Sequence, residues 1–187
     1  MDRLSVMELK PLSIEGAFEI LPEPNSDVRG YFVRTYDEAW FREHGLHRDW
    51  VQESQSMTQA KDVVRGLHFQ CPPHAETKIM RLTQGRALDV LVDLRSTSAT
   101  YRQWCAVELS SETMNMVFAP PGCAHGFCTL TEDVVIQYKI DVPHAPGHEG
   151  GLRWNDPQIG IQWSVDQPQL SERDAALPGW SEFKNPF

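Results

Sequence analysis

Short β-prone runs that recur about every ten residues from residue 50 onward constrain the fold of this chain more than any other feature. In ALDVLVDLR, residues 87–95, apolar positions alternate with mostly polar ones, as on a strand whose side chains point to opposite faces in turn. This run predicts a strand with one apolar face, made of Leu88, Val90, Val92 and Leu94. Similar runs are WCAVELS, NMVFAP, GFCTL and VVIQYKI, separated by clusters of Ser, Thr, Pro and Gly. Such spacing is typical of a β-sandwich or a β-barrel.

One helical pattern, YDEAWFREHG at residues 36–45, precedes these strands. Asp37 is a suitable N-cap, aromatic residues stand four apart at Tyr36 and Trp40, and Gly45 ends the pattern. The sequence therefore predicts a short helix outside the sheet.

The chain shows no linker, low-complexity segment or internal repeat. Its 187 residues are enough to bury a core without disulfides or metals. Pro and Trp accumulate after residue 154, which indicates a tail that wraps the barrel. We therefore expect a single domain over residues 1–187, in which residues 1–50 and 155–187 are extensions that pack on the barrel.

The charge and hydropathy patterns argue against several classes of protein. The chain has 17 Lys and Arg against 26 Asp and Glu, and the basic residues are scattered, so we expect no nucleic-acid partner. The N-terminal MDRLSVMELK lacks the apolar core of a signal peptide, and no run of about 18 apolar residues is present to span a membrane. We expect a cytoplasmic protein without membrane contact. The absence of a C-x-x-C pair favours ordinary buried thiols at Cys71, Cys105, Cys123 and Cys128.

The run VVRGLHFQ, residues 63–70, places a histidine in an apolar strand pattern directly after Arg-Gly. Because side chains alternate along a strand, Gly66, His68 and Gln70 share one face, which is polar and relieved of bulk by the glycine. Taken alone, this pattern favours a half-exposed strand histidine on a solvated face.

Other residues with chemical capacity lie on or beside the predicted strands, at Lys78, His125 and Tyr138. If the sheet closes, inward-facing side chains from different strands converge in one cavity, as in other β-barrels that bind small molecules. In VVIQYKI, Tyr138 shares a face with Val134 and Ile136. A tyrosine at the edge of the core, whose hydroxyl finds a partner, is the ordinary alternative.

The segment APPGCAHGF contains a P-x-G-x-x-H arrangement that resembles the second motif of the cupin superfamily, whose fold is a double-stranded β-helix or jelly roll. In metal-binding cupins the first motif supplies an H-x-H pair and a glutamate. His68, His74 and Glu76 match that motif only in part, and the H-x-H pair is missing. Since a divalent metal needs three or four ligands in suitable geometry, we expect no metal.

A closer resemblance covers most of the chain, from about Arg29 to Asp174. The runs VRGLHFQ, K-x-x-R-x-x-x-G from Lys78 to Gly85, DVLVDLR, PPGCAHGF, GLRWNDPQIGIQW and LSERD are similar to those of the dTDP-4-dehydrorhamnose 3,5-epimerase family, in the same order. The resemblance implies an all-β cupin jelly roll with short peripheral helices. It also implies a cytoplasmic homodimer without metal or cofactor. The implied reaction inverts C3, C5 or both in a nucleotide-diphosphate-linked 4-keto-6-deoxy sugar.

The resemblance also implies roles for four residues. His68 resembles the family's base, which removes a proton beside the ketone, and Asp174 resembles the carboxylate that orients it. Tyr138 resembles the acid that returns a proton from the opposite face, and Lys78 resembles the cation at the carbonyl oxygen. For Asp174 an alternative stays open, because Ser171 and Asp174 also fit a variant of the helix capping box.

Family positions that bind the substrate carry over to further residues. The diphosphate-binding positions correspond to Arg29, Arg65 and Arg173, and other ligand contacts correspond to Gln52, His125 and Glu149. Arginine suits phosphate oxygens because its planar guanidinium donates two parallel hydrogen bonds.

Several substrate-binding positions depart from the family pattern. Where the family has V-Q-D-N-H-S the chain reads VQESQS, so that Glu53, Ser54 and Gln55 replace Asp, Asn and His. Arg34 replaces a glutamate and His144 replaces a tyrosine, both near the nucleotide base in the family. The acid and base positions persist, so the reaction type is better determined by the sequence than the substrate.

Three classes of function therefore stay open. The first is the sugar-nucleotide epimerase. The second is a metal-dependent cupin oxygenase that uses His68, His74, Glu76 and His125. The third is a cupin that binds a sugar nucleotide without catalysis.

Overall fold

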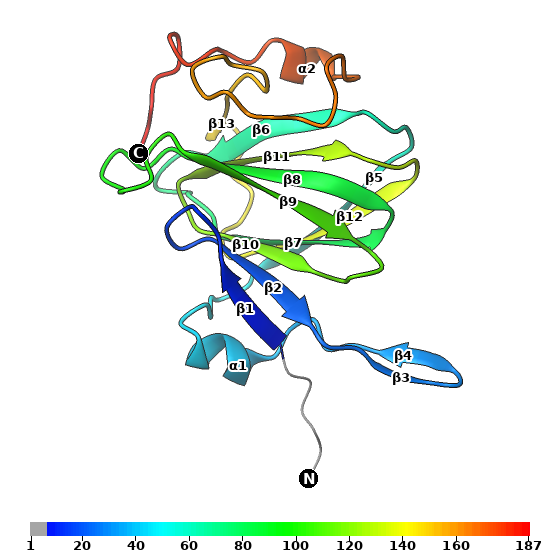
Figure 1. Cartoon of the computed structure of the whole chain (residues 1–187). Helices are drawn as coiled ribbons and strands as arrows, with labels where there is room; N and C mark the ends of the chain where they lie inside the picture. The colour runs from blue at the N-terminus through cyan, green and yellow to red at the C-terminus, as the bar shows by residue number, and fades with distance from the viewer. Residues whose placement is uncertain (1–6) are drawn as a thin grey trace.

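Two facing antiparallel β-sheets form the body of the protein in the computed structural model, which describes residues 7–187 (Figure 1). The six-stranded sheet contains, in spatial order, β1 (Met7–Pro11), β2 (Phe18–Pro22), β10 (Met116–Ala119), β7 (Lys78–Gln84), β12 (Val134–Ile140) and β5 (Gln52–Thr58). The five-stranded sheet contains β13 (Glu149–Gly151), β6 (Val64–Gln70), β11 (Cys123–Thr129), β8 (Arg86–Asp93) and β9 (Trp104–Ser110). The predicted all-β jelly roll is confirmed.

A hairpin and two short helices complete the described elements. The hairpin pairs β3 (Asn25–Asp27) with β4 (Gly30–Phe32) and projects away from the two sheets (Figure 1). The helices are α1 (Glu38–Glu43) and α2 (Glu172–Ala175). Both are peripheral, as expected from the sequence.

Alternation along the strands places one set of apolar side chains between the sheets. Met80 and Ile136 from the six-stranded sheet pack with Leu91 and Phe127 from the five-stranded sheet in one buried cluster. Burying each such side chain contributes roughly 1.5–3 kcal/mol, so this cluster is a principal source of the attraction between the sheets. Tyr138 packs against the same cluster, on the face that it was predicted to share with Val134 and Ile136.

Strand β8 carries the predicted apolar face, but that face points away from the space between the sheets. Val90, Val92 and Leu94 belong to a second buried cluster, on the outer side of the five-stranded sheet. The other face of β8 contributes Leu91 to the cluster between the sheets and also buries Asp89. Both faces of the strand are therefore covered, and its two aspartates, Asp89 and Asp93, are buried.

The C-terminal segment supplies the cover for this outer face. Trp163, Trp180, Phe183 and Phe187 pack against the second cluster, and the segment runs over the five-stranded sheet in Figure 1. Aromatic side chains bury a large area each, which suits them to covering a sheet without forming regular secondary structure. The aromatic side chains of this segment therefore close the outer face of the five-stranded sheet.

The N-terminal segment is partly cover and partly sheet. Helix α1 places Phe41 against Ile79, Met116 and Phe118 on the outer face of the six-stranded sheet. Strands β1 and β2, which also lie within residues 1–50, extend that sheet by hydrogen bonding to β10. Residues 7–50 therefore supply two strands of this sheet as well as a helix that packs on it.

The local signals for α1 are confirmed. The side chain of Asp37 accepts a hydrogen bond from the Trp40 backbone N–H at 3.1 Å, which is an N-cap interaction. Gly45 has φ of +72°, a left-handed conformation that glycine adopts without strain, and the helix has ended by this residue.

Strands β6 and β11 approach closely where both carry a glycine. A Cβ atom at Gly66, whose φ is +118°, would lie 2.7 Å from the Cα of Gly126 and 2.8 Å from the carbonyl oxygen of His125. The glycine of the Arg-Gly-Leu-His run therefore makes room for the neighbouring backbone rather than for a ligand. The close approach accompanies a register in which His68 and His125 stand opposite each other.

Three of the four cysteines are buried thiols, as predicted. Burial raises the pKa of Cys105 and of Cys123 to about 12 and also raises that of Cys128, whereas Cys71 is partly exposed. Among residues 7–187 no helix has the length and apolar character needed to cross a membrane. The start of the N-terminal segment in which we found no signal-peptide core, residues 1–6, lies outside the described residues.

Candidate active site

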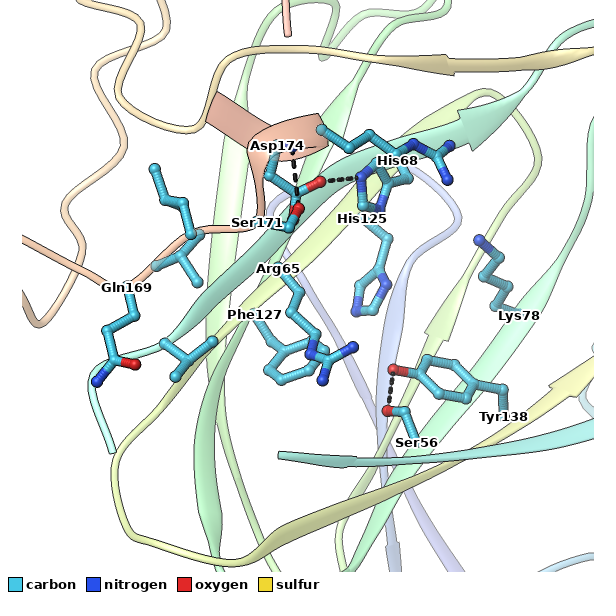
Figure 2. A pocket seen from close by; sticks show the side chains of 14 residues that line it. Ser56, Arg65, His68, Lys78, His125, Phe127, Tyr138, Gln169, Ser171 and Asp174 are labelled. Carbon is cyan, nitrogen blue, oxygen red and sulfur yellow. Dashed lines mark hydrogen bonds and ion pairs between the residues drawn. The ribbon is translucent and has the colours of Figure 1, made fainter. Parts of the chain in front are cut away.

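A cavity of about 570 Å³ opens between the two sheets and brings together the residues predicted to converge. It is lined by His68 from β6, Lys78 from β7, His125 from β11 and Tyr138 from β12 (Figure 2). Its size falls within the range of small-molecule sites. The four residues come from four strands, so only the closed fold assembles them.

His68 is paired with Asp174, as the sequence predicted. The His68 Nε2 and Asp174 Oδ1 atoms lie 2.7 Å apart, and the other carboxylate oxygen accepts the backbone N–H of Gly66 at 3.3 Å. Asp174 lies on α2, where its own N–H donates to the N-cap Ser171 at 3.1 Å. The capping interaction and the histidine pair therefore coexist, and the cap fixes the position of the carboxylate.

The environment of His68 keeps its imidazole neutral. Burial lowers the pKa of His68 below its usual value, and the Asp174 carboxylate opposes that shift only in part. Because Nε2 faces the carboxylate, Nδ1 is the ring nitrogen left to accept a proton, and no hydrogen bond to it occurs within the described part of the chain. The side chain of His68 is 34% exposed, so this nitrogen is accessible from the cavity.

Tyr138 stands on the opposite wall, in the six-stranded sheet. Its hydroxyl lies 3.2 Å from the Ser56 hydroxyl, and its ring centroid lies 6.3 Å from that of His125. Burial raises the pKa of Tyr138 to about 12, although the Ser56 hydrogen bond acts in the other direction. The phenol is therefore protonated at physiological pH. In Figure 2 the Tyr138–Ser56 pair and the His68–Asp174 pair lie on opposite sides of the His125 ring.

Lys78 is held in an ion pair at the cavity wall. Its Nζ atom lies 2.6 Å from Oε1 of Glu76, and the two side chains are 15% and 9% exposed. Sequence reasoning considered Glu76 only as a metal ligand, whereas the structure gives it the lysine as its partner. An acidic residue two positions before the lysine was the available signal for this pair.

A second histidine–aspartate pair escaped sequence reasoning. His125 Nε2 lies 2.7 Å from Asp89 Oδ2, and both side chains are buried. His125 was predicted to contact the substrate, but its carboxylate partner lies on β8, 36 residues earlier in the chain. In the sequence, the only signal for Asp89 was its polar position in an alternating strand. Alternation does not identify which face of a strand points into the cavity.

A smaller chamber of about 280 Å³ adjoins the main cavity and shares three lining residues with it, which are His68, Lys78 and Arg173. Its remaining lining includes four of the predicted substrate-binding residues, Gln52, Ser54, His144 and Glu149. Arg65, also predicted to bind substrate, lines the main cavity. Most of the predicted binding residues therefore surround one continuous site.

Hydrogen bonds connect the rim of the smaller chamber. Glu149 lies 2.9 Å from His144 Nε2 and 3.1 Å from Arg173 Nη2. His144, followed by Arg173, lowers the pKa of the Glu149 carboxyl. The Gln52 side chain accepts the backbone N–H of His144 at 2.6 Å. The rim is thus a connected group of polar side chains that can accept and donate hydrogen bonds.

Two predicted binding residues lie outside both chambers. Arg29 follows β3 in the projecting hairpin and pairs with Asp27 at 2.5 Å. Arg34 pairs with Asp37 at the N-terminus of α1, at 3.1 Å. Within this chain neither arginine lines the cavity that holds His68 and Tyr138.

The residues of the metal-cupin alternative have other partners. The His74 ring lies against that of His148 in a tilted arrangement with centroids 4.5 Å apart, Glu76 pairs with Lys78, and His68 and His125 each face an aspartate. Within residues 7–187 no group of three or more His, Cys, Asp or Glu side chains is arranged to hold a metal ion.

The chemistry available in the main cavity is proton transfer at a carbon next to a carbonyl. Such a reaction needs a base on one side of the carbon, an acid on the other, and a cation or hydrogen-bond donor at the oxygen that gains charge. His68 and Tyr138 offer the first two from opposite sheets. Lys78 offers the third.

Comparison with known proteins gives a match to a family over most of the chain. The family model described as dTDP-4-dehydrorhamnose 3,5-epimerase matches residues 11–182. A dTDP-4-dehydrorhamnose 3,5-epimerase of Sinorhizobium fredii is 41% identical over 185 residues, which are 98% of this chain and 95% of the relative.

Solved structures give the same result. The dTDP-4-dehydrorhamnose 3,5-epimerase of Bacillus anthracis, with TDP and PPi bound, superposes with a TM-score of 0.91 at 36% identity, covering 93% of this chain and 99% of that one. The dTDP-6-deoxy-D-glucose-3,5-epimerase of Legionella pneumophila, in complex with dTDP-4-keto-L-rhamnose, also reaches a TM-score of 0.91, at 32% identity over 96% of this chain and 95% of the other.

Proposed function

The chain belongs to the dTDP-4-dehydrorhamnose 3,5-epimerase family, and from this premise we propose how its cavity inverts C3, C5 or both in a nucleotide-diphosphate-linked 4-keto-6-deoxy sugar. Family membership makes the protein an isomerase that epimerises sugar nucleotides in deoxysugar biosynthesis. One observation carries the proposed mechanism. His68 and Tyr138 line one cavity from opposite sheets, with the pKa of the histidine lowered and that of the phenol raised.

His68 is the base in this mechanism. The lowered pKa leaves its imidazole neutral at physiological pH, so Nδ1 can take the proton from the carbon beside the ketone. Asp174 holds the ring through Nε2 and stabilises the imidazolium that forms. The pair therefore both aims the base and compensates its charge.

Lys78 and His125 stabilise the enolate. As the proton leaves, negative charge develops on the ketone oxygen, and groups already in place there lower the barrier without reorganising. Lys78 supplies a cation from the six-stranded sheet, and His125 supplies a second polar group from the five-stranded sheet. Losing one such donor costs on the order of 3 kcal/mol in the barrier.

Tyr138 completes the inversion. Its phenol keeps its proton because burial raises its pKa to about 12, and it faces the sugar from the six-stranded sheet. Proton return from that side leaves the carbon inverted, whereas return from His68 restores the original configuration. The opposite placement of the two groups is therefore what makes the site an epimerase.

The diphosphate lies where the main cavity meets the smaller chamber, and the nucleoside lies in the smaller chamber. Arg65 and Arg173 bind the phosphate oxygens through their guanidinium groups. Gln52, Ser54, His144 and Glu149 contact the nucleoside in the smaller chamber. The bound ligands of the solved relatives support a nucleotide sugar as the ligand of this site.

The decisive experiment is a substrate screen in D₂O. The 4-keto-6-deoxyglucose derivatives of dTDP, CDP, GDP and UDP are incubated with the purified protein, and deuterium at C3 and C5 is followed by NMR. We expect incorporation with inversion for at least one of them, and the labelled positions identify the carbons epimerised. Binding of a sugar nucleotide without any exchange would contradict the mechanism and support a non-catalytic binding protein.

We also propose that the protein acts as a homodimer in which the hairpin of one chain reaches the other. The large hydrophobic side chains that are most exposed in the described chain lie on the hairpin or at β5, and they are Val28, Tyr31, Phe32, Val51 and Met57. Strand β5 is the edge of the six-stranded sheet, with one side unpaired. An exposed edge strand is a ready site for pairing with another strand, because its backbone groups on that side are unpaired.

This dimer explains the position of Arg29. The hairpin that carries Arg29 projects from its own chain, and β5 contributes Ser54 and Ser56 to the chambers. A hairpin that docks along the β5 edge of the partner therefore brings Arg29 to the partner's site, where a guanidinium suits the diphosphate.

Mixing of inactive variants tests the shared site. Arg29→Glu and His68→Ala are each expected to lack activity alone, and co-expression should restore part of it because one of the two sites in a mixed dimer is intact. With formation of the inverted product as the readout, co-expression of His68→Ala with Tyr138→Phe is the matched control, since no site in that dimer holds both residues. If the Arg29→Glu mixture behaves like the control, Arg29 does not act across the dimer.

A further inference from the structure

Lys78 stands where the two chambers meet, and its long side chain needs a fixed partner there. It lines both chambers, and its side chain is only 15% exposed. The ammonium group is a compact charge on a flexible four-carbon stem, and an interior charge is unfavourable unless it is paired. Among residues 7–187 the structure records a single ion-pair partner for it, which is Glu76 at 2.6 Å.

Glu76 is itself fixed by a third residue. Its two carboxylate oxygens have separate partners, because Oε1 faces Lys78 and Oε2 accepts a hydrogen bond from the Gln70 side chain at 3.0 Å. Gln70 is 4% exposed, and its amide oxygen accepts the backbone N–H of Ala145 at 2.7 Å. The same amide nitrogen also donates to the carbonyl oxygen of His74 at 3.2 Å. The carboxylate is therefore held in one orientation.

These contacts connect the two walls of the cavity. Lys78 begins β7 in the six-stranded sheet, whereas Gln70 ends β6 in the five-stranded sheet, two residues after His68. The path from Lys78 through Glu76 to Gln70 thus spans from the wall with the cation to the strand with the base. It links the ammonium group proposed to face the enolate oxygen to the strand that carries the proposed base.

We propose that Glu76, held by Gln70, is a positioning residue that keeps the Lys78 ammonium group aimed at the enolate oxygen, an inference that rests on the function proposed above. Glu76 touches the lysine, and its effect on the reaction passes through Lys78. What the site requires from residue 76 is an acceptor at the right distance, because an acceptor oxygen is what restrains the ammonium group. A small displacement of a reacting group can cost about 100-fold in rate.

Two substitutions at residue 76 that keep a side chain of similar length distinguish the effect of the acceptor oxygen from the effect of side-chain volume. Glu76→Gln keeps an oxygen that can accept from Lys78, and we expect its kcat to stay within about fivefold of the unmodified protein, since an acceptor is retained. Glu76→Met removes both oxygens but fills the same space, and we expect kcat to fall by about 100-fold. The KM for dTDP-4-keto-6-deoxyglucose, or for the sugar nucleotide selected by the screen, should change little because Arg65 and Arg173 bind the diphosphate.

A double substitution tests whether the effect passes through the lysine. Lys78→Met removes the ammonium group, so adding Glu76→Met to it should cause no further loss of kcat. If the two losses multiply instead, Glu76 acts independently of Lys78 and the proposal is overturned. Equal rates for Glu76→Met and Glu76→Gln would overturn it as well. Thermal unfolding and nucleotide affinity of each variant show that the fold and the binding site are intact.

The failure of this inference differs from that of the proposed function. If the unmodified protein exchanges no deuterium into any of the four 4-keto-6-deoxy sugar nucleotides, the proposed mechanism falls and this inference falls with it. If the unmodified protein exchanges normally and Glu76→Met does the same, only the positioning role is overturned.

Discussion

The two walls of the cavity carry different kinds of chemical group, although both are antiparallel sheets of one jelly roll. The five-stranded sheet contributes two histidines, His68 and His125, each with a carboxylate at 2.7 Å. The six-stranded sheet contributes proton donors instead, the Tyr138 phenol and the Lys78 ammonium group. On the proposed mechanism the base stands on one wall, the accepting wall, and the acid and the cation stand on the other, the donating wall, which gives the site a direction.

The two histidine pairs on the accepting wall also differ from each other. The side chain of His68 is 34% exposed and its partner is carried by α2, whereas that of His125 is 8% exposed and its partner lies on the adjacent strand. An accessible imidazole can exchange its proton with solvent, and a buried one is better placed to hold a fixed orientation. On the proposed mechanism the exposed pair therefore moves protons and the buried pair stabilises charge.

Replacing His68 should have the largest effect, because it removes the only group proposed to start the reaction. We expect His68→Ala to abolish both deuterium incorporation and epimer formation, a loss at or beyond the 10,000-fold limit typical of a positioned base. NMR in D₂O measures both. Exchange that persists in this variant would transfer the role of base to His125 and break the distinction between the two pairs.

Replacing Tyr138 should uncouple exchange from inversion. Tyr138→Phe leaves the accepting wall intact, so His68 can still remove a proton and return a deuteron to the same face. We expect deuterium to enter with retention while the inverted product falls by about 100-fold to 10,000-fold. If this variant inverts its substrate at the normal rate, the phenol is a packing group and the donating wall lacks its proposed acid.

The resemblance to the family, carried by short local runs, predicted the residues that are proposed to act on either wall. His68 follows Arg-Gly-Leu, Tyr138 lies in a strand with clear alternation, and Asp174 follows a helix N-cap at Ser171. Alternation and spacing predicted a β-sandwich or β-barrel, and capping residues with a glycine stop predicted α1, because these are properties of short segments. The resemblance to the family added the jelly roll.

The partners of these groups could not be predicted, because they depend on which face of a strand turns inward. Asp89 reaches His125 because the apolar face of β8 points outward, under the C-terminal segment, and the polar face points inward. From the sequence alone, the apolar face of a strand is expected to point into the core and the polar face to point to solvent. Glu76 and Gln70 are likewise joined only when the two sheets close on each other.

Weakening the Asp174 interaction should have an intermediate effect. Asp174→Asn keeps the shape of the side chain but removes the charge that stabilises the protonated His68, so we expect exchange to slow by about 100-fold, the lower end of the range for a positioned base. Nucleotide affinity should stay near normal because the arginines are unchanged. A variant with lost affinity and normal exchange would show that Asp174 serves binding or the helix cap.

A change of pH should alter the exchange rate less than any of these substitutions, and it distinguishes the two walls most directly. Because burial lowers the pKa of His68 below about 6.5, its usual value, the base is active above that pH and is lost as the pH falls through the lowered pKa. The rate should therefore be flat near pH 7 and fall about tenfold per pH unit at acid pH. No alkaline limb from Tyr138 should occur below about pH 12, since burial raises its pKa to about 12.

Asp174→Asn sharpens this test. The Asp174 carboxylate raises the pKa of His68 against the larger effect of burial, so its removal should move the acid limb to still lower pH. Tyr138→Phe should leave the acid limb of deuterium exchange where it is, because the donating wall does not set the protonation of the base. If the acid limb of the pH–rate profile shifts in Tyr138→Phe but not in Asp174→Asn, the group that titrates at acid pH is not His68.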